Sequence, residues 1–227
     1  MNPPATAQYN LVFLVAFLAV LSGCSVRSAL TPLFDGKSLE GWEVKAGPED
    51  IWRVEDGAIV CEGSGNPRGW LGTRKIFRDF VLSCEWKIVE NGNSGIFLRV
   101  ADDPEQNPAY DAIEIQICDD SGSDYRDLSP EEISGSIYAV AGASKRMYRG
   151  PNRWNRYVIR CIGPNISLDY NGETVLDIDI RDYPKPFLWF NRKRPPLMSR
   201  PHEGCIALQT HGSEVWFRNI SIREIQR

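Results

Sequence analysis

The sequence predicts an all-β protein: a single-domain antiparallel sandwich of two sheets, with jelly-roll connections. Three observations support this prediction. Apolar and polar residues alternate with period two in several short runs, as in strands with one face in a core. Turns rich in Gly, Pro and Asn separate these runs. No run beyond the N-terminal leader keeps a helical period, so the strands must form the fold.

The N-terminal segment has the composition of an export signal. Residues 11–21 form an unbroken apolar run that is too short to span a bilayer and suits the core of a signal peptide. The run ends in "LSGC", where small residues precede Cys24. This order resembles the bacterial lipobox, in which the cysteine is lipidated. We therefore expect a lipoprotein signal peptide over 1–23, a short tether over 24–30 and one domain over 31–227.

The first ten residues leave one alternative open. They carry no Lys or Arg, whereas a signal peptide usually begins with positive charge. An uncleaved membrane anchor is therefore the other interpretation of this leader. In both cases the protein leaves the cytoplasm. We expect it in the bacterial cell envelope, as a periplasmic or surface-exposed lipoprotein.

Composition limits the classes of partner. The 227 residues carry a formal net charge of −4 with acids and bases interspersed, and no basic stripe is present, so nucleic acid is not an expected partner. The roughly 200 residues after the leader suffice for one domain with a substantial core. Seven Trp, eight Tyr and nine Phe favour strands and also provide flat surfaces for sugar rings.

Metal and disulfide chemistry have little support in the sequence. Besides Cys24 there are five cysteines, with no CxxC pair and no close spacing to the two histidines, so we expect no zinc site and no cofactor. Their odd number leaves at least one thiol unpaired, and one disulfide remains an option. Loop aspartates offer oxygen ligands for calcium, but without the twelve-residue calcium-loop pattern a solvated acidic loop is favoured. These aspartates are Asp102, Asp103, Asp119, Asp120 and Asp124.

Hairpins follow one another along the domain. "WRVEDGAIVCEG" predicts two strands around Asp56-Gly57, and "DFVLSCEWKIVENGNSGIFLRV" predicts two joined at "ENGN". "RWNRYVIRCIGPNISLDYNGETVLDIDI" contains turns at 163–165 and 171–172. "GCIALQTHGSEVWFRNISIREI" closes the chain with two strands joined by a His-Gly-Ser turn. The order of elements is that of a sandwich.

Three polar or irregular stretches interrupt the strands. Residues 101–111 and 119–135 flank the strand that contains Glu114, and residues 181–203 form a long connection rich in Pro, Arg and aromatics. Loops of this length are usually functional or disordered. The aromatic residues of the third stretch, Trp189 among them, argue against disorder. We interpret it as a lid over a site, with packing beneath the sandwich as the equal alternative.

The alternation of side chains along a strand places polar residues opposite the apolar face on four separate predicted strands. They are Glu85, Asn93, Arg99, Glu114, Gln116, Gln209 and His211. An ordinary solvated face usually carries mobile and redundant Lys, Thr, Glu and Ser. A set of Arg, Glu, Gln and His from separate strands better suits a surface that binds sugar hydroxyl groups. Tyr138, which follows a polar loop, is expected to border the same surface.

Six segments together resemble one known family. They are "LFDGKSLEGW", "NSGIFLR", "IEIQI", "RWNRYVI", "LDYNGETV" and "IALQTHGSEVWFRNISI". In this order they resemble the 3-keto-disaccharide hydrolase family over roughly residues 31 to 226. The resemblance implies a concanavalin A-like jelly roll. It also implies action on glycosides oxidised to a ketone at C3 of the sugar.

That substrate would define the chemistry. A carbonyl at C3 acidifies the hydrogen on C2 and makes the glycosidic oxygen on C1 a β leaving group, so elimination followed by addition of water cleaves the bond. Such a route needs a base beside C2, for which His211 and Glu114 are the candidates. It also needs a cation at the enolate oxygen, for which Arg99 is the candidate. The expected substrate-binding residues are Gln116, Gln209, Glu85, Asn93, Tyr138 and Trp189.

Two other functions remain open at this stage. Ordinary glycoside hydrolysis requires a pair of carboxylates, for instance Glu85 with Glu114. Gln116 stands where a second acid would follow Glu114 on the same strand, which counts against that pair. A carbohydrate-binding module without catalysis is the third interpretation, because this fold serves lectins as readily as enzymes.

Overall fold

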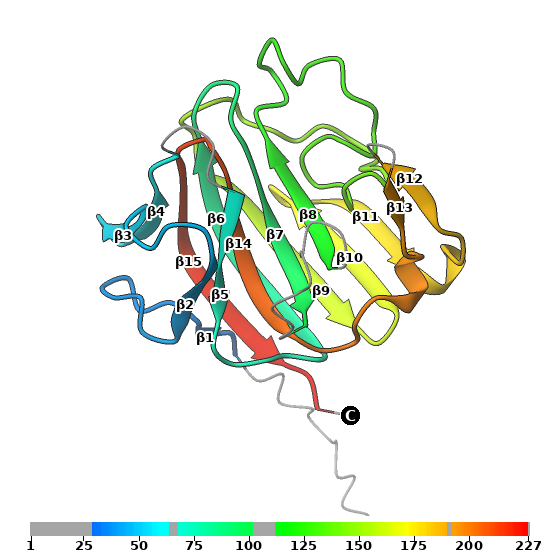
Figure 1. Cartoon of the computed structure of the whole chain (residues 1–227), viewed down its shortest axis with the longest axis horizontal. Helices are drawn as coiled ribbons and strands as arrows, with labels where there is room; N and C mark the ends of the chain where they lie inside the picture. Colours follow the sequence, from blue (N-terminus) through cyan, green and yellow to red (C-terminus); the bar gives the residue numbers. More distant parts are fainter. Residues whose placement is uncertain (1–28, 64–67, 102–111, 190–191, 227) are drawn as a thin grey trace, which may run out of the picture.

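The computed structural model describes residues 29–63, 68–101, 112–189 and 192–226, and it contains two antiparallel sheets packed face to face (Figure 1). The predicted all-β sandwich is therefore confirmed. The larger sheet has the strand order β11-β10-β9-β6-β15-β4-β3, with β1 also paired to β15. The five-stranded sheet has the order β2-β5-β14-β7-β8. In the described part of the chain, no helix is long and apolar enough to cross a membrane.

The strands of the larger sheet are β1 (Thr31–Pro32), β3 (Trp52–Glu55), β4 (Ala58–Cys61), β6 (Phe80–Ile88), β9 (Asn155–Ile162), β10 (Asn165–Tyr170), β11 (Glu173–Asp179) and β15 (Val215–Glu224). Those of the five-stranded sheet are β2 (Trp42–Ala46), β5 (Arg68–Thr73), β7 (Asn93–Val100), β8 (Ile113–Cys118) and β14 (Cys205–His211).

The predicted hairpin turns are present. Asp56 and Gly57 have φ of 49° and 75° between β3 and β4, and Asn171 and Gly172 have φ of 52° and 96° between β10 and β11. Positive φ at both central residues is the requirement of a type I′ turn, which Asn-Gly and Asp-Gly satisfy. The local sequence therefore determines these two turns.

The core lies between the two sheets. Ile96, Ile115 and Leu208 of the five-stranded sheet belong to one buried cluster with Leu82 and Trp86 of the larger sheet. Burying a side chain of this size contributes about 1.5–3 kcal/mol. The five described cysteines are also buried, and all are free thiols.

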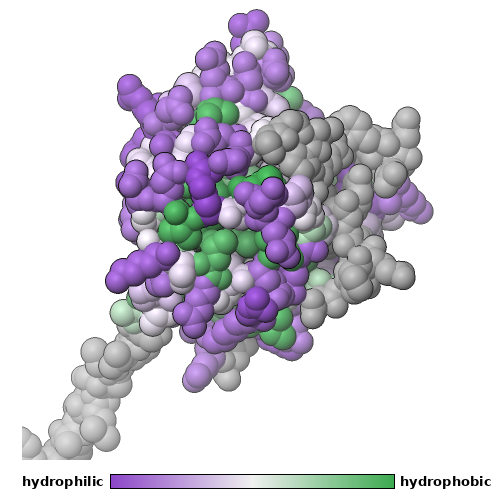
Figure 2. Space-filling view, turned by 60° about the vertical axis from the view of Figure 1, so that its left-hand side comes forward, coloured by the Kyte–Doolittle hydropathy of each residue, from purple (hydrophilic) through white to green (hydrophobic). Residues whose placement is uncertain are grey.

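The edge formed by β2 to β5 carries apolar side chains at the surface. Figure 2 shows this side of the molecule, with hydrophobic residues grouped near its centre among hydrophilic ones. Leu39, Val44 and Val54 are only partly buried here and pack against the core. The sandwich core therefore reaches solvent at this edge.

The predicted long loop over 181–203 is more ordered than expected. It contains the 3-10 turns η1 (Ile180–Asp182, which begins one residue earlier) and η2 (Leu197–Ser199). Between them lies a hairpin of β12 (Phe187–Trp189) and β13 (Arg192–Arg194). Figure 1 shows this hairpin on the side of the molecule where β8 and β11 lie.

A β-bulge near the end of β7 changes the direction of Arg99. The register between β7 and β14 shifts by one residue between Phe97 and Val100. Arg99 lies in this bulge with φ of 54°, in the left-handed region. The extra residue breaks the alternation of faces. Arg99 therefore points toward the larger sheet, and Val100 returns to the face of Phe97.

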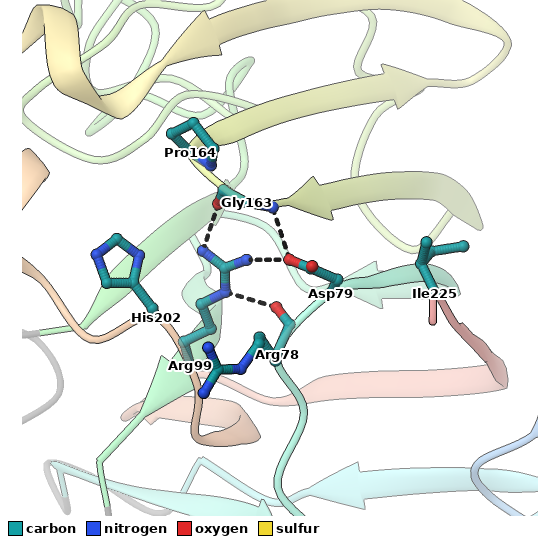
Figure 3. A pocket seen from close by; sticks show the side chains of 7 residues that line it. All are labelled: Arg78, Asp79, Arg99, Gly163, Pro164, His202 and Ile225. Atoms are coloured by element: carbon teal, nitrogen blue, oxygen red, sulfur yellow. Dashed lines mark hydrogen bonds and ion pairs between the residues drawn. The ribbon is translucent and has the colours of Figure 1, made fainter. Parts of the chain in front are cut away.

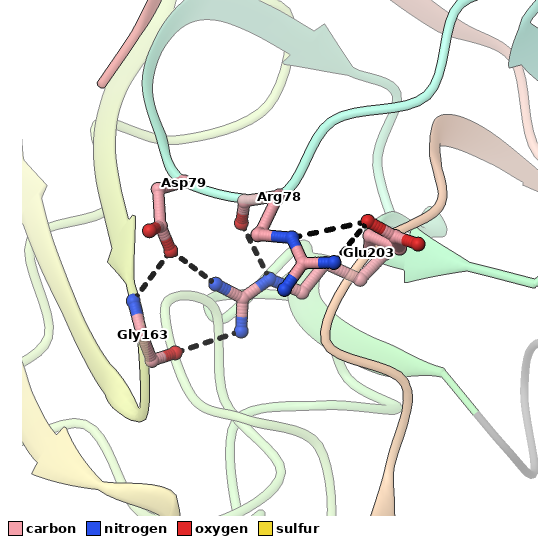
Figure 4. Close-up of polar contacts among 5 residues, drawn as sticks. Arg78, Asp79, Gly163 and Glu203 are labelled. Atoms are coloured by element: carbon pink, nitrogen blue, oxygen red, sulfur yellow. Dashed lines mark hydrogen bonds and ion pairs between the residues drawn. The ribbon is translucent and has the colours of Figure 1, made fainter. Parts of the chain in front are cut away.

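The Arg99 guanidinium forms a buried clamp between the sheets (Figure 3). Its Nε donates to the carbonyl of Arg78 at 2.8 Å, Nη1 to the carbonyl of Gly163 at 2.9 Å, and Nη2 to Asp79 Oδ1 at 3.1 Å. The Arg99 and Asp79 side chains are 1% and 4% exposed. Asp79 Oδ1 also accepts from the Gly163 amide at 2.6 Å (Figure 4). The clamp joins β7 to the start of β6 and to the β9–β10 turn.

We predict that Arg99→Met lowers the free energy of unfolding by about 3–5 kcal/mol, because it leaves the buried Asp79 carboxylate without its counter-charge. The matched control is Arg78→Met. The Arg78 side chain pairs with Glu203 at the surface, where the two are 65% and 51% exposed, so its loss should cost less than about 1 kcal/mol. Urea denaturation of both variants measures the difference. Equal losses would mean that the clamp does not join the sheets.

Candidate functional site

The outer face of the five-stranded sheet, which is turned away from the core, brings together five of the predicted site residues. β8 presents Glu114 and Gln116, β14 presents Gln209 and His211, and β7 presents Asn93. Their neighbours in sequence are the apolar residues that face the core. Alternation along each strand therefore predicts this face correctly.

Strand register arranges four outer-face residues in a row across the sheet. Gln209 of β14 pairs with Trp70 of β5, and Gly95 of β7 pairs with Gln116 of β8. The register between β14 and β7 makes Gln209 and Gly95 neighbours. We call Trp70, Gln209, Gly95 and Gln116 the Trp70 row.

The Glu114 carboxyl lies over Gly95 in this row. A Cβ atom placed on Gly95 would be 2.6 Å from Glu114 Oε1 and 3.0 Å from its Cγ. Any larger residue at position 95 would displace the carboxyl. The glycine therefore leaves room for the Glu114 side chain, which lies across the strand there. Glu114 itself is only 6% exposed.

Burial raises the pKa of Glu114 to about 8. A hydrogen bond from the Gln209 side chain and the positive charges of Arg194 and Arg200 lower the pKa, but burial has the larger effect. A carboxyl with a pKa near neutrality exchanges protons readily and is suited to general acid–base catalysis. Among the residues of this face, the Glu114 carboxyl is thus the group best suited to acid–base chemistry.

The 181–203 segment supplies the positive charge beside Glu114. Arg194 at the end of β13 and Arg200 after η2 are both buried, at 6% and 5% exposure. Arg200 donates to the carbonyl of Ala112, next to β8, and its guanidinium lies 5.7 Å from the centre of the Phe187 ring. Neither arginine was among the site residues predicted from the sequence. Their clustering in "RKRPPLMSR" was the available signal.

Two amide oxygens of the outer face have no donor among the described residues. They are the buried Oε1 atoms of Gln116 and Gln209. The Gln116 amide nitrogen donates to Asn93 Oδ1 at 3.4 Å. A buried acceptor without a donor costs free energy, so these two oxygens suit the hydroxyl groups of a ligand.

Two of the predicted placements are wrong. Arg99 does not lie with Glu114, because the β-bulge turns it into the clamp between the sheets. Glu85 lies on β6, in the other sheet, where its Oε2 accepts from Arg218 Nε at 2.8 Å. Parity along a strand indicates which face a residue occupies, but it does not indicate to which sheet the strand belongs.

The remaining predicted residues have mixed outcomes. Tyr138 is half-buried beside β8, and its backbone N–H donates to the carbonyl of Glu114 at 3.0 Å. Trp189 belongs to β12, but its side chain lies outside the described residues, as does Cys24. Trp70, which was not among the predicted site residues, lies on the outer face beside Gln209.

The described residues contain no group of three or more His, Cys, Asp or Glu side chains arranged to hold a metal ion. Asp102 and Asp103, two of the candidate calcium ligands, lie outside the described residues. The Asp119 carboxylate accepts from the backbone N–H of Asn91 and from Ser121. Its oxygens therefore organise the local loop.

Comparison with known proteins identifies relatives over most of the chain. Residues 29–223 match the family described as 3-keto-alpha-glucoside-1,2-lyase-like domain. A 3-keto-disaccharide hydrolase of Bacteroides thetaiotaomicron is 29% identical over 226 residues, with 84% of this chain and 77% of that protein covered.

Solved structures support the same assignment. A protein of Parabacteroides distasonis described as a glycosyl hydrolase has a TM-score of 0.74 at 28% identity, covering 87% of this chain and all of that one. The carbohydrate-binding module CBM66 of Bacillus subtilis has a TM-score of 0.55 at 11% identity, with 81% of this chain and 96% of that one covered. This second likeness concerns the fold alone.

We predict that Glu114 makes the protein less stable as the pH rises. Its pKa is about 8 in the folded chain against an ordinary 4.5, so between these values the folded state holds a proton that the unfolded state has released. Stability relative to Glu114→Gln should therefore fall between pH 4.5 and 8 and level off above, by at least about 1.4 kcal/mol, or one pKa unit. Denaturant unfolding of both proteins across this range tests it. A stability difference that does not change with pH would contradict the raised pKa.

Proposed function

The chain belongs to the 3-keto-alpha-glucoside-1,2-lyase-like family, and on this basis we propose that it cleaves the glycosidic bond of 3-keto-disaccharides or 3-keto-glycosides. The observation that supports this proposal best is the buried Glu114 carboxyl, with a pKa of about 8, among two glutamines and two arginines. A 3-keto sugar requires a base of this strength, because its C2 hydrogen is only weakly acidic.

The reaction begins with removal of the proton on C2 by the ionised Glu114. The electron pair of the C2–H bond moves toward the C3 carbonyl, and the resulting enolate expels the glycosidic oxygen from C1. The positive charges of Arg194 and Arg200, which act on Glu114 in the free protein, are suited to stabilise the enolate oxygen. They take the role that the sequence analysis gave to Arg99.

The leaving oxygen needs a proton, and the unsaturated sugar then needs water. His211 lies two residues from Gln209 on the same face of β14, so we assign it the proton donor. Water adds its oxygen to C1 and gives one proton back to His211, and C2 regains a proton from Glu114. The sum is hydrolysis, although the bond breaks by elimination. This sequence of steps accounts for both a lyase-like family description and a relative named hydrolase.

Ordinary glycoside hydrolysis has less support. It needs two carboxyl groups on either side of the scissile bond. Glu85, the expected partner of Glu114, belongs to the other sheet and is paired with Arg218. The charged groups that shift the Glu114 pKa are two arginines and include no second described carboxylate.

We predict that the mature domain cleaves a 3-keto-disaccharide and that the parent disaccharide is cleaved at least about 100-fold more slowly, since only the ketone acidifies C2. Glu114→Gln should lower kcat at least about 100-fold, and the rise of wild-type kcat/KM with pH below about 8 should disappear with it. Monosaccharide release measures cleavage of both sugars by the wild type and cleavage of the 3-keto-disaccharide by Glu114→Gln. Equal cleavage of both sugars would indicate an ordinary glycosidase, and binding without turnover would indicate a carbohydrate-binding module.

Export and lipidation are a second part of the proposal. Residues 11–21 and the "LSGC" sequence ending at Cys24 support a lipoprotein of the cell envelope. Cys24→Ala should abolish incorporation of labelled fatty acid and leave a precursor of higher mass. Unchanged labelling of this variant would exclude Cys24 as the lipidated residue.

A further inference from the structure

Trp70 is an aromatic residue of the outer face for which the reaction above has no role. It lies on β5 next to Gln209 and is half-buried. Its ring meets the Phe97 ring edge-on, with centroids 6.5 Å apart and planes at 87°. It packs against a small buried cluster that is separate from the sandwich core and contains Phe97, Val100, Ala112, Cys205 and Ala207. Packing therefore fixes the ring, while part of it remains accessible.

Polar groups lie beside the Trp70 ring. Gln209 is its neighbour on β14, with a buried side-chain oxygen that has no donor among the described residues. On the other side, Ala46 of β2 pairs with Trp70, and Glu43 pairs with Gly72, two residues along β5. Glu43 forms an ion pair with Lys45, and their side chains are 29% and 25% exposed. An accessible aromatic ring flanked by hydrogen-bonding groups suits a sugar, which has an apolar C–H face and a rim of hydroxyls.

The spacing between the strands that carry Trp70 and Gly95 matches a two-ring substrate. The Glu114 carboxyl lies over Gly95 of β7, and β14 separates β7 from β5. Trp70 is therefore two strand spacings from Gly95, about 10 Å. One sugar ring and its glycosidic oxygen bridge such a distance. A ring with C2 at Glu114 extends across Gln209, and the next ring then lies at Trp70.

We propose that Trp70 binds the second sugar ring of a 3-keto-disaccharide, the ring that leaves with the glycosidic oxygen. This inference rests on the proposed function, since it takes Glu114 as the base at C2 of the first ring. Trp70 contributes to binding of the leaving ring and has no part in proton transfer. The enzyme is accordingly selective for disaccharides over keto-glycosides with a small leaving group.

The test compares kcat/KM for a 3-keto-disaccharide with that for a methyl 3-keto-glucoside. Trp70→Ala should lower the ratio of the two values about tenfold, the loss expected for one stacked ring, and Trp70→Phe should restore most of it. Trp154→Ala is the matched control. The centre of the Trp154 ring is 3.8 Å from Cζ of Arg218, which lies on β15 of the larger sheet, away from the outer face. This control should leave the ratio unchanged. A Trp70→Ala variant with an unchanged ratio, through equal loss on both substrates or no loss, would overturn the proposal.

A second measurement separates failure of this inference from failure of the proposed function. If the wild type turns over neither keto sugar, the proposed function is wrong. Calorimetric binding of the same two sugars to the wild type and to the Trp70 and Trp154 variants then tests the ring-binding site alone. Selective weakening of disaccharide binding in Trp70→Ala supports the site. Equal binding by all three proteins overturns it.

Discussion

The packing of the two sheets against each other is the constraint on which the rest of the structure depends. Because side chains alternate along a strand, burying Ile113, Ile115 and Ile117 in the core turns Glu114 and Gln116 to the outer face. The same alternation acts on β14, where burial of Leu208 turns Gln209 outward. Polar residues that are distant in sequence therefore meet on one surface, because the apolar residues between them are buried in the core.

Side chains also pack against one another on the outer face, and this packing changes the pKa of Glu114. A carboxyl on a solvated strand would have an ordinary pKa, but Glu114 is enclosed over Gly95 and has a pKa of about 8. This enclosure opposes folding at high pH, where the carboxyl must ionise in a buried position. The protein thus retains at this position a group that opposes folding when it ionises.

The buried arginines of this protein differ in what they contact. Arg99 is a buried arginine on a site strand, yet three of its donors bind Asp79, the carbonyl of Arg78 and the carbonyl of Gly163. Arg194 and Arg200 come from a connection with little regular structure, yet they act on Glu114. The first joins the two sheets, whereas the other two place positive charge beside Glu114.

The fold class, the hairpin turns at Asp56-Gly57 and Asn171-Gly172, and the face that carries Glu114 could all be predicted from the order of residues. These features follow from local rules: period-two alternation and the φ angles that Asn, Asp and Gly adopt. Three features became apparent only in the folded chain: Glu85 belongs to the other sheet, Arg99 turns inward, and Trp70 lies beside Gln209. Sheet membership, register and bulges depend on contacts between strands far apart in sequence, and alternation within one strand carries no information about them.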